Sequence, residues 1–184
     1  MDGISKAARI FTKIIEVSHW VATGLMGAVG ILSLAAPQLL KFVMDVDSLK
    51  AEGEISLYGF TAQLSDAAGR INYLALFLYA IGAVAIFALM ALIFRNIYQV
   101  IKQSESSTPF SAGNVKRLKQ TGLFSIAIPL VGLVMSILIR LIVGSETAEI
   151  SVDLEGFVWG ILVLCLTRYF AHGAALENEV DGLL

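Results

Sequence analysis

The sequence predicts an all-α membrane protein with four transmembrane helices and a short pair of β-strands outside the membrane. Of its 184 residues, 57% are hydrophobic and 15% are charged, against roughly 45–50% and about 25% in soluble domains. The mean hydropathy is +0.80. The net charge of −2 offers no basic surface for nucleic acid, so we expect no direct nucleic-acid binding. This composition excludes an ordinary soluble domain and indicates a chain whose main surroundings are the lipid bilayer.

Four stretches are long and apolar enough to cross roughly 30 Å of hydrocarbon. We expect the spans at about residues 17–40, 71–94, 120–143 and 154–173. The first two contain no Asp, Glu, Lys or Arg over 24 residues each. The fourth is the weakest because Arg168 interrupts it, but an arginine near a helix end can extend to the lipid headgroups.

A separate element precedes the first span. Residues 1–16 place their apolar side chains near one helical face and most charged side chains on other faces, which is typical of an amphipathic helix at the membrane surface. We therefore divide the chain into an interfacial helix over 1–16 and a transmembrane domain over 17–184. The second part includes a cytoplasmic loop at 95–119 and a cytoplasmic tail at 174–184. A basic anchor that only sets topology explains the first segment equally well.

The distribution of basic residues predicts the orientation. Nine Lys and Arg residues fall on the side that holds both termini and the 95–119 loop, and four fall on the other side. Basic residues favour the cytoplasmic side of a membrane. The sequence therefore predicts a multi-pass protein of a bacterial inner membrane with cytoplasmic N- and C-termini.

The two external loops share a short sequence. Glu54-Ile55-Ser56 in the first is matched by Glu149-Ile150-Ser151 in the second. Residues 150–155 alternate between apolar and polar, which is the pattern of a strand. We expect a helix–strand–helix repeat whose two strands pair with each other outside the membrane.

Several residues are candidates for helix packing or bending. Gly24 and Ala28 are four residues apart, as are Gly156 and Gly160. Small residues at this spacing let helix backbones approach closely, either within one chain or between two copies of it. Pro129 lies inside the third span, where the missing backbone N–H favours a kink.

The spans offer little for catalysis. The inner parts of the expected spans contain no Asp or Glu, and the chain has no HExxH, Walker or GxGxxG motif, so we expect neither an enzyme nor a cofactor. Two alternatives stay open. His19 and His172 could ligate a haem in a small b-type membrane protein, although histidines at a membrane interface are common. The Pro129 kink and the repeated hairpins suggest a small transporter or a transporter subunit, which the lack of membrane carboxylates disfavours.

The cytoplasmic side carries the richest pattern. Phe110 and Asn114 could order the 95–119 loop, and the basic residues that follow complement the acidic C-terminal segment. This charge pattern fits either an intramolecular clamp or a docking surface for a cytoplasmic partner. The candidate residues for these two roles are Phe110, Asn114, Lys116, Arg117, Lys119, Arg168, His172, Glu177 and Glu179.

Two stretches on this side resemble a known family. The first is Thr108-Pro109-Phe110 followed by Asn114, a basic pair and Leu118, and the second is Phe170, Gly173, Leu176 and Glu179. Both are similar to the bacterial domain-of-unknown-function 2975 family of four-span membrane proteins, although the last residues, 181–184, depart from its usual ending. The resemblance implies no catalytic residue. Genes of that family often neighbour small helix-turn-helix regulators, which implies a membrane protein that anchors or signals to such a transcriptional regulator. Self-association is a further option.

Overall fold

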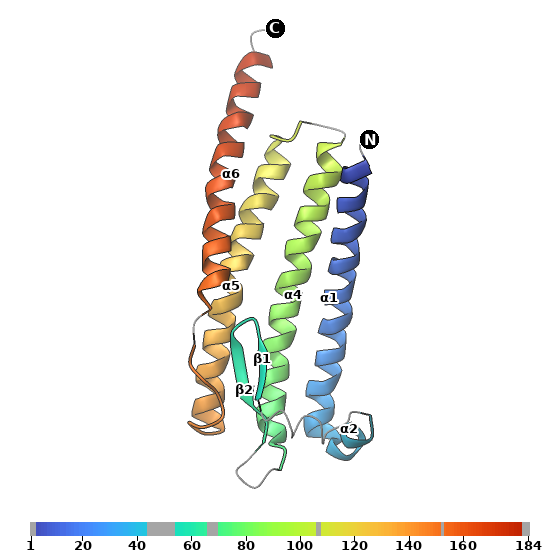
Figure 1. The fold of residues 1–184 in the computed structure, drawn as a ribbon, viewed down its shortest axis with the longest axis vertical. Coiled ribbons are helices and arrows are strands. Elements are labelled where there is room, and N and C mark those ends of the chain that lie inside the picture. Colours follow the sequence, from blue (N-terminus) through green and yellow to red (C-terminus); the bar gives the residue numbers. More distant parts are fainter. Residues whose placement is uncertain (1–2, 44–53, 66–69, 106–107, 152, 182–184) are drawn as a thin grey trace. The chain divides into compact units, whose positions relative to one another are not determined.

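Four long helices dominate the structure. The computed structural model describes residues 3–43, 54–65, 70–105, 108–151 and 153–181. Within these ranges, four helices are long and apolar enough to cross a membrane: α1 (Gly3–Ala35), α4 (Tyr73–Ser104), α5 (Ala112–Ile142) and α6 (Leu154–Asp181) (Figure 1). The smaller elements are α2 (Pro37–Val43), β1 (Glu54–Leu57) and β2 (Phe60–Gln63). The predicted fold class, four spanning helices with a small strand pair, is confirmed.

The helices extend further than the expected spans. α1 is continuous from Gly3 to Ala35, so the structure has no boundary between residues 16 and 17, where the sequence suggested two elements. Most of the expected 95–119 loop is helical, and α6 continues through the expected tail to Asp181. At 1.5 Å per residue the four long helices, of 33, 32, 31 and 28 residues, are about 42–50 Å long, which exceeds the hydrocarbon thickness of roughly 30 Å. Their ends therefore have to lie outside the hydrocarbon.

The chain divides into two compact units. Unit 1 contains Met1–His19, Leu89–Ala127 and Glu155–Leu184, and unit 2 contains Trp20–Ala88 and Ile128–Leu154. Both terminal segments and the connection between α4 and α5 therefore belong to unit 1. The strands and the connection between α5 and α6 belong to unit 2. This grouping agrees with a chain whose two ends and middle loop share one side of a membrane.

The strand pair is a hairpin within the first external loop. β1 pairs antiparallel with β2, from Glu54 opposite Gln63 to Leu57 opposite Phe60. The two residues between the strands have positive φ values, 49° at Tyr58 and 78° at Gly59, as a type I′ turn requires. Gly59 interrupts the strand pattern because it reverses the chain.

The expected pairing between the two external loops is not what the structure shows. Residues 148–151 form no strand. The second loop contacts the hairpin at single points instead: the Gln63 N–H donates to the Thr147 carbonyl at 2.8 Å, and the Ser151 hydroxyl donates to the Gly59 carbonyl at 3.0 Å. Of the alternating residues 150–155, Val152 lies outside the described residues and the others form no strand.

One aromatic residue anchors the hairpin in unit 2. Phe60 is fully buried and stacks on Tyr79 of α4, with ring centroids 4.9 Å apart. A Cβ atom at Gly82 of α4 would lie 2.6 Å from Phe60 Cε1, and one at Gly132 of α5 would lie 3.3 Å from Phe60 Cβ. The two glycines therefore leave the space that Phe60 occupies, because any larger residue at Gly82 would enter the ring.

A second pair of glycines brings α5 and α6 together in unit 1. A Cβ atom at Gly160 would lie 2.9 Å from the Gly122 carbonyl oxygen, and one at Gly122 would lie 3.0 Å from the Gly160 carbonyl oxygen. Gly160 therefore does lie in a close helix contact, while Gly156 is half-buried. Such reciprocal contacts are typical of small residues at membrane helix crossings.

The other expected packing pair, Gly24 and Ala28, makes no close contact within the described residues, and its packing between two copies stays a prediction. Gly24 has open space around its Cβ position, and Ala28 is exposed. α1 instead approaches α4 through Gly27 and Gly30, where a Cβ at Gly30 would lie 3.1 Å from the Ala80 Cβ. α5 stays helical through Pro129, and the kink at that residue stays a prediction.

Candidate functional site

The connection between α4 and α5 is held against α6 by an aromatic contact. The rings of Phe110 and Phe170 have centroids 5.3 Å apart and are tilted by 56°. A Cβ atom at Gly173 would lie 2.7 Å from Phe110 Cδ1. Gly173 is thus the point at which α6 admits the Phe110 ring, and the contact joins the connection to the last helix of unit 1.

Asn114 fixes the start of α5. It is fully buried, and its Nδ2 donates to the Ser104 hydroxyl and to the Pro109 carbonyl, both at 3.2 Å. The Asn114 backbone N–H donates to the Ser111 carbonyl at 2.9 Å. One side chain therefore links the end of α4, the connection and α5. This is a structural role, since a buried amide with these partners has no surface to offer.

Arg117 points to α4 rather than to the acidic C-terminal segment. Its Nε donates to Gln99 Oε1 at 2.8 Å, and its Nη1 donates to Gln103 Oε1. No ion pair joins Lys116, Arg117 or Lys119 to Glu177 or Glu179 in the part of the chain that the structure describes. The expected ionic clamp is therefore replaced by the aromatic contact of Phe110, with Arg117 satisfied by two glutamines.

The N-terminal end of α1 is tied to the end of α4, which the sequence analysis missed. Glu105 accepts from Arg9 Nη1 at 2.9 Å and from the Ser5 hydroxyl at 2.6 Å. Further along, Lys13 Nζ lies 5.3 Å from the ring centroid of Tyr98 and 2.9 Å from Glu16 Oε2. Charge complementarity could have predicted this contact, because Glu105 is the one acidic residue between positions 95 and 119 and the N-terminal segment is basic.

Six of the nine candidate side chains, all of them in unit 1, are left over by these contacts. Within the described ranges, none of them makes a hydrogen bond or ion pair with the rest of the chain. Five are exposed and Glu177 is half-buried. We call this set the charged surface; it consists of Lys116, Lys119, Arg168, His172, Glu177 and Glu179.

The structure does not bring the two histidines together. His19 donates from Nδ1 to the Ile15 carbonyl at 2.8 Å and stacks on Phe94, with centroids 5.7 Å apart. His172 is exposed on α6. Within unit 1, Figure 1 shows α4 and α5 between α1 and α6. The haem alternative at His19 and His172 stays a prediction.

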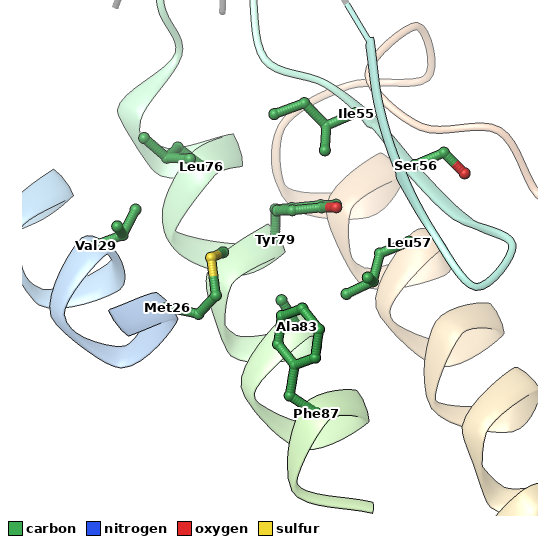
Figure 2. Close-up of a pocket in the computed structure, with 9 residues that line it drawn as sticks. All are labelled: Met26, Val29, Ile55, Ser56, Leu57, Leu76, Tyr79, Ala83 and Phe87. Carbon is green, nitrogen blue, oxygen red and sulfur yellow. The ribbon is translucent and has the colours of Figure 1, made fainter. Parts of the chain in front are cut away.

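Unit 2 contains an apolar cavity of about 260 Å³. Its walls come from three elements: α1, β1 and α4 (Figure 2). The lining residues are Met26, Val29, Ile55, Ser56, Leu57, Leu76, Tyr79, Ala83 and Phe87. No pattern in the sequence indicates this cavity, because most of its lining residues are ordinary apolar residues when each is considered within its own segment.

The fold defines the class of protein to which this chain belongs. Four apolar helices of spanning length indicate a multi-pass membrane protein. No family model, no curated protein and no solved structure matches the chain. The function therefore has to be argued from the residues themselves.

Proposed function

We propose that this chain is a non-enzymatic, multi-pass protein of a bacterial inner membrane that anchors or signals to a cytoplasmic partner through the charged surface of unit 1. The observation that carries the proposal is that the nine candidate residues fall into two groups, those held in contacts within the chain and those without a partner. Three of them make contacts within the chain: Phe110, Asn114 and Arg117. The remaining six residues have no partner among the described residues and stay on the outside.

The internal contacts make the charged surface a fixed platform. Arg117 and Asn114 join α5 to α4, and Phe110 joins the connection to α6. Lys116 and Lys119 flank Arg117 on α5, while Arg168 and His172 are on α6. A rigid arrangement of charges favours binding because little conformational entropy is lost on association. Charges at an interface also steer encounter and suppress wrong partners.

The orientation supports a cytoplasmic partner. The side with both termini and the connection between α4 and α5 has nine basic residues against four on the other side. Both terminal segments and this connection fall in unit 1. The resemblance of residues 108–118 and 170–179 to domain-of-unknown-function 2975 proteins suggests the class of partner, a small helix-turn-helix regulator.

The test is crosslinking in the native host, followed by affinity capture in mild detergent and mass spectrometry. We expect wild-type protein to capture a small DNA-binding protein. The double variant Lys116→Gln/Lys119→Gln should capture about threefold to tenfold less, because exposed charges contribute up to about 1 kcal/mol each. Lys6→Gln is the matched control, since it removes one exposed positive charge from α1 in the same unit.

Two results would contradict the proposal. One is equal capture by wild type and the double variant, which would separate binding from the charged surface. The other is recovery of copies of this chain alone, which would leave the charged surface without a cytoplasmic partner.

A further inference from the structure

The cavity of unit 2 lies within the segments that cross the membrane. Met26 and Val29 belong to the first expected span, and Leu76, Tyr79, Ala83 and Phe87 belong to the second. The third wall is β1, with Ile55 and Leu57 (Figure 2). β1 lines the cavity beside residues of both expected spans, so this strand lies at the level of the lipid hydrocarbon rather than outside the membrane, where the sequence placed it.

Water is a poor occupant of this cavity. A buried water needs two to four polar partners, and only Ser56 and Tyr79 among the lining residues have polar side-chain atoms. The Ser56 hydroxyl already accepts from the Thr61 hydroxyl at 3.3 Å, and Figure 2 shows it directed away from the other lining side chains. The remaining surface is aliphatic or aromatic.

The size of the cavity suits a stretch of hydrocarbon. It measures about 260 Å³, whereas an engineered apolar cavity of about 150 Å³ holds benzene. It is too small for a helix of a partner protein, whose diameter with side chains is about 10 Å. If the cavity were empty, the residues of its walls would lack dispersion contacts on the side that faces it.

The walls leave a route from the bilayer. α1 and β1 form opposite sides and α4 forms the floor between them (Figure 2). In the described part of the chain no other element contributes a lining residue. On α1, the neighbour of Met26 is Leu25, which is 63% exposed, so the outer face of the same helix turn faces lipid.

We infer that this cavity is a binding site for one acyl chain of a membrane lipid, which inserts between α1 and β1 and rests on α4. This site is in the other unit from the charged surface, so it is independent of the proposed function. It involves no polar recognition, and the ligand is selected by the shape and depth of the apolar walls. The same chain completes the support of β1, since Ile55 and Leu57 would contact it.

The experiment uses the full chain in vesicles of phosphatidylethanolamine and phosphatidylglycerol. A trace of phosphatidylethanolamine carries a photoreactive diazirine midway along one acyl chain, and the labelled residues are mapped by mass spectrometry. We expect labelling at Met26, Leu57 or Phe87 in addition to Leu25. Labelling of Leu25 serves as the internal reference, because that side chain faces lipid in any case.

Two variants fill the cavity from different walls. Val29→Phe and Ala83→Leu should each reduce labelling of the cavity residues relative to Leu25 by several-fold. Val29 is half-buried and Ala83 is fully buried, so the first variant keeps the test valid if the second fails to fold. Val21→Trp is the matched control: it adds a bulky side chain at a position of α1 that is 56% exposed, and labelling of the cavity residues relative to Leu25 should be unchanged.

Two results would overturn the inference. The first is cavity labelling that is absent in wild type or unaffected by both filling variants, which would mean that no acyl chain enters. The second is retention of a small apolar molecule that is not a lipid, detected by native mass spectrometry of the purified protein, together with a loss of cavity labelling when it is bound. That result would assign the cavity to a different ligand class.

Discussion

Replacing Gly82 with alanine should destabilise unit 2, although alanine is the better helix former. The new Cβ would lie 2.6 Å from Phe60 Cε1 and 3.1 Å from Met135 Cγ. The Phe60 ring cannot simply swing aside, since it is fully buried and stacked on Tyr79. Overpacking of this kind costs about 1–3 kcal/mol. The substitution therefore destabilises the packing of Phe60, which holds the hairpin between α4 and α5.

Gly24→Ala is the matched control for this substitution. Gly24 is also inside a helix of unit 2, but nothing lies within 4 Å of its Cβ position. Both variants share the gain in helix propensity of up to about 1 kcal/mol. Their difference therefore isolates the clash, and Gly82→Ala should be less stable than Gly24→Ala by about 1–3 kcal/mol.

The assay is thermal unfolding in mild detergent, followed by far-UV circular dichroism and repeated in a Phe60→Ala background. Phe60→Ala alone should cost about 3–5 kcal/mol, because it empties a fully buried aromatic site. In that background the extra methyl of Gly82→Ala has room and should no longer be harmful, so the two substitutions are strongly coupled. Equal stability of Gly82→Ala and Gly24→Ala, or the same penalty with and without the Phe60 ring, would refute the reasoning.

Two further predictions concern unit 1. Gly173→Val should displace the Phe110 ring, because a Cβ atom at Gly173 would lie 2.7 Å from Phe110 Cδ1. We expect it to lower the free energy of unfolding by about 1–3 kcal/mol and to make limited proteolysis between α4 and α5 faster. An unchanged cleavage rate would argue against the aromatic contact. The Arg9–Glu105 pair is partly exposed, so a double-mutant cycle with alanine at both positions should give a coupling of about 0.2–1 kcal/mol that decreases in high salt. A coupling insensitive to salt would mean that the two residues interact by packing rather than by charge.

The helices were predictable because their signal is local. A run of apolar residues long enough to cross the bilayer indicates a span whatever its neighbours are. Three of the four expected spans fall on single helices, to within two residues at their ends, whereas the first, 17–40, covers the end of α1 at Ala35 and the start of α2 at Pro37. Their ends were not predictable to the same degree, because the charged turns beyond the hydrocarbon are polar yet remain helical. This is why most of the expected loop at 95–119 is helical and residues 3–16 are continuous with the rest of α1.

The strand pair shows where a local signal was misread. No turn was predicted directly after residues 54–57, whereas Tyr58 and Gly59 form the turn of a hairpin with positive φ at both residues. The similarity of Glu54-Ile55-Ser56 to Glu149-Ile150-Ser151 then suggested the wrong partner. Three matching letters specify no register, whereas a two-residue turn fixes one.

The contacts of the candidate site could not be read from the sequence, because they depend on which helices are neighbours. Charge complementarity suggested the acidic C-terminal segment as the partner of Arg117, but two glutamines on α4 satisfy it. The packing of Phe110 on Gly173 joins residues that are far apart in the chain. The sequence did identify the candidate residues of unit 1. The structure then separates the candidates that make contacts within the chain from those that make none.

The most direct test of the account is cysteine labelling of the charged surface in spheroplasts. In a Cys165→Ala background, which removes the single native cysteine, Lys116→Cys and Ser145→Cys place one thiol each at exposed positions of unit 1 and unit 2. With a membrane-impermeant maleimide, the account predicts labelling of Ser145→Cys in intact spheroplasts and of Lys116→Cys only after permeabilisation. Labelling of Lys116→Cys in intact spheroplasts would place the charged surface outside the cell and would contradict a cytoplasmic partner.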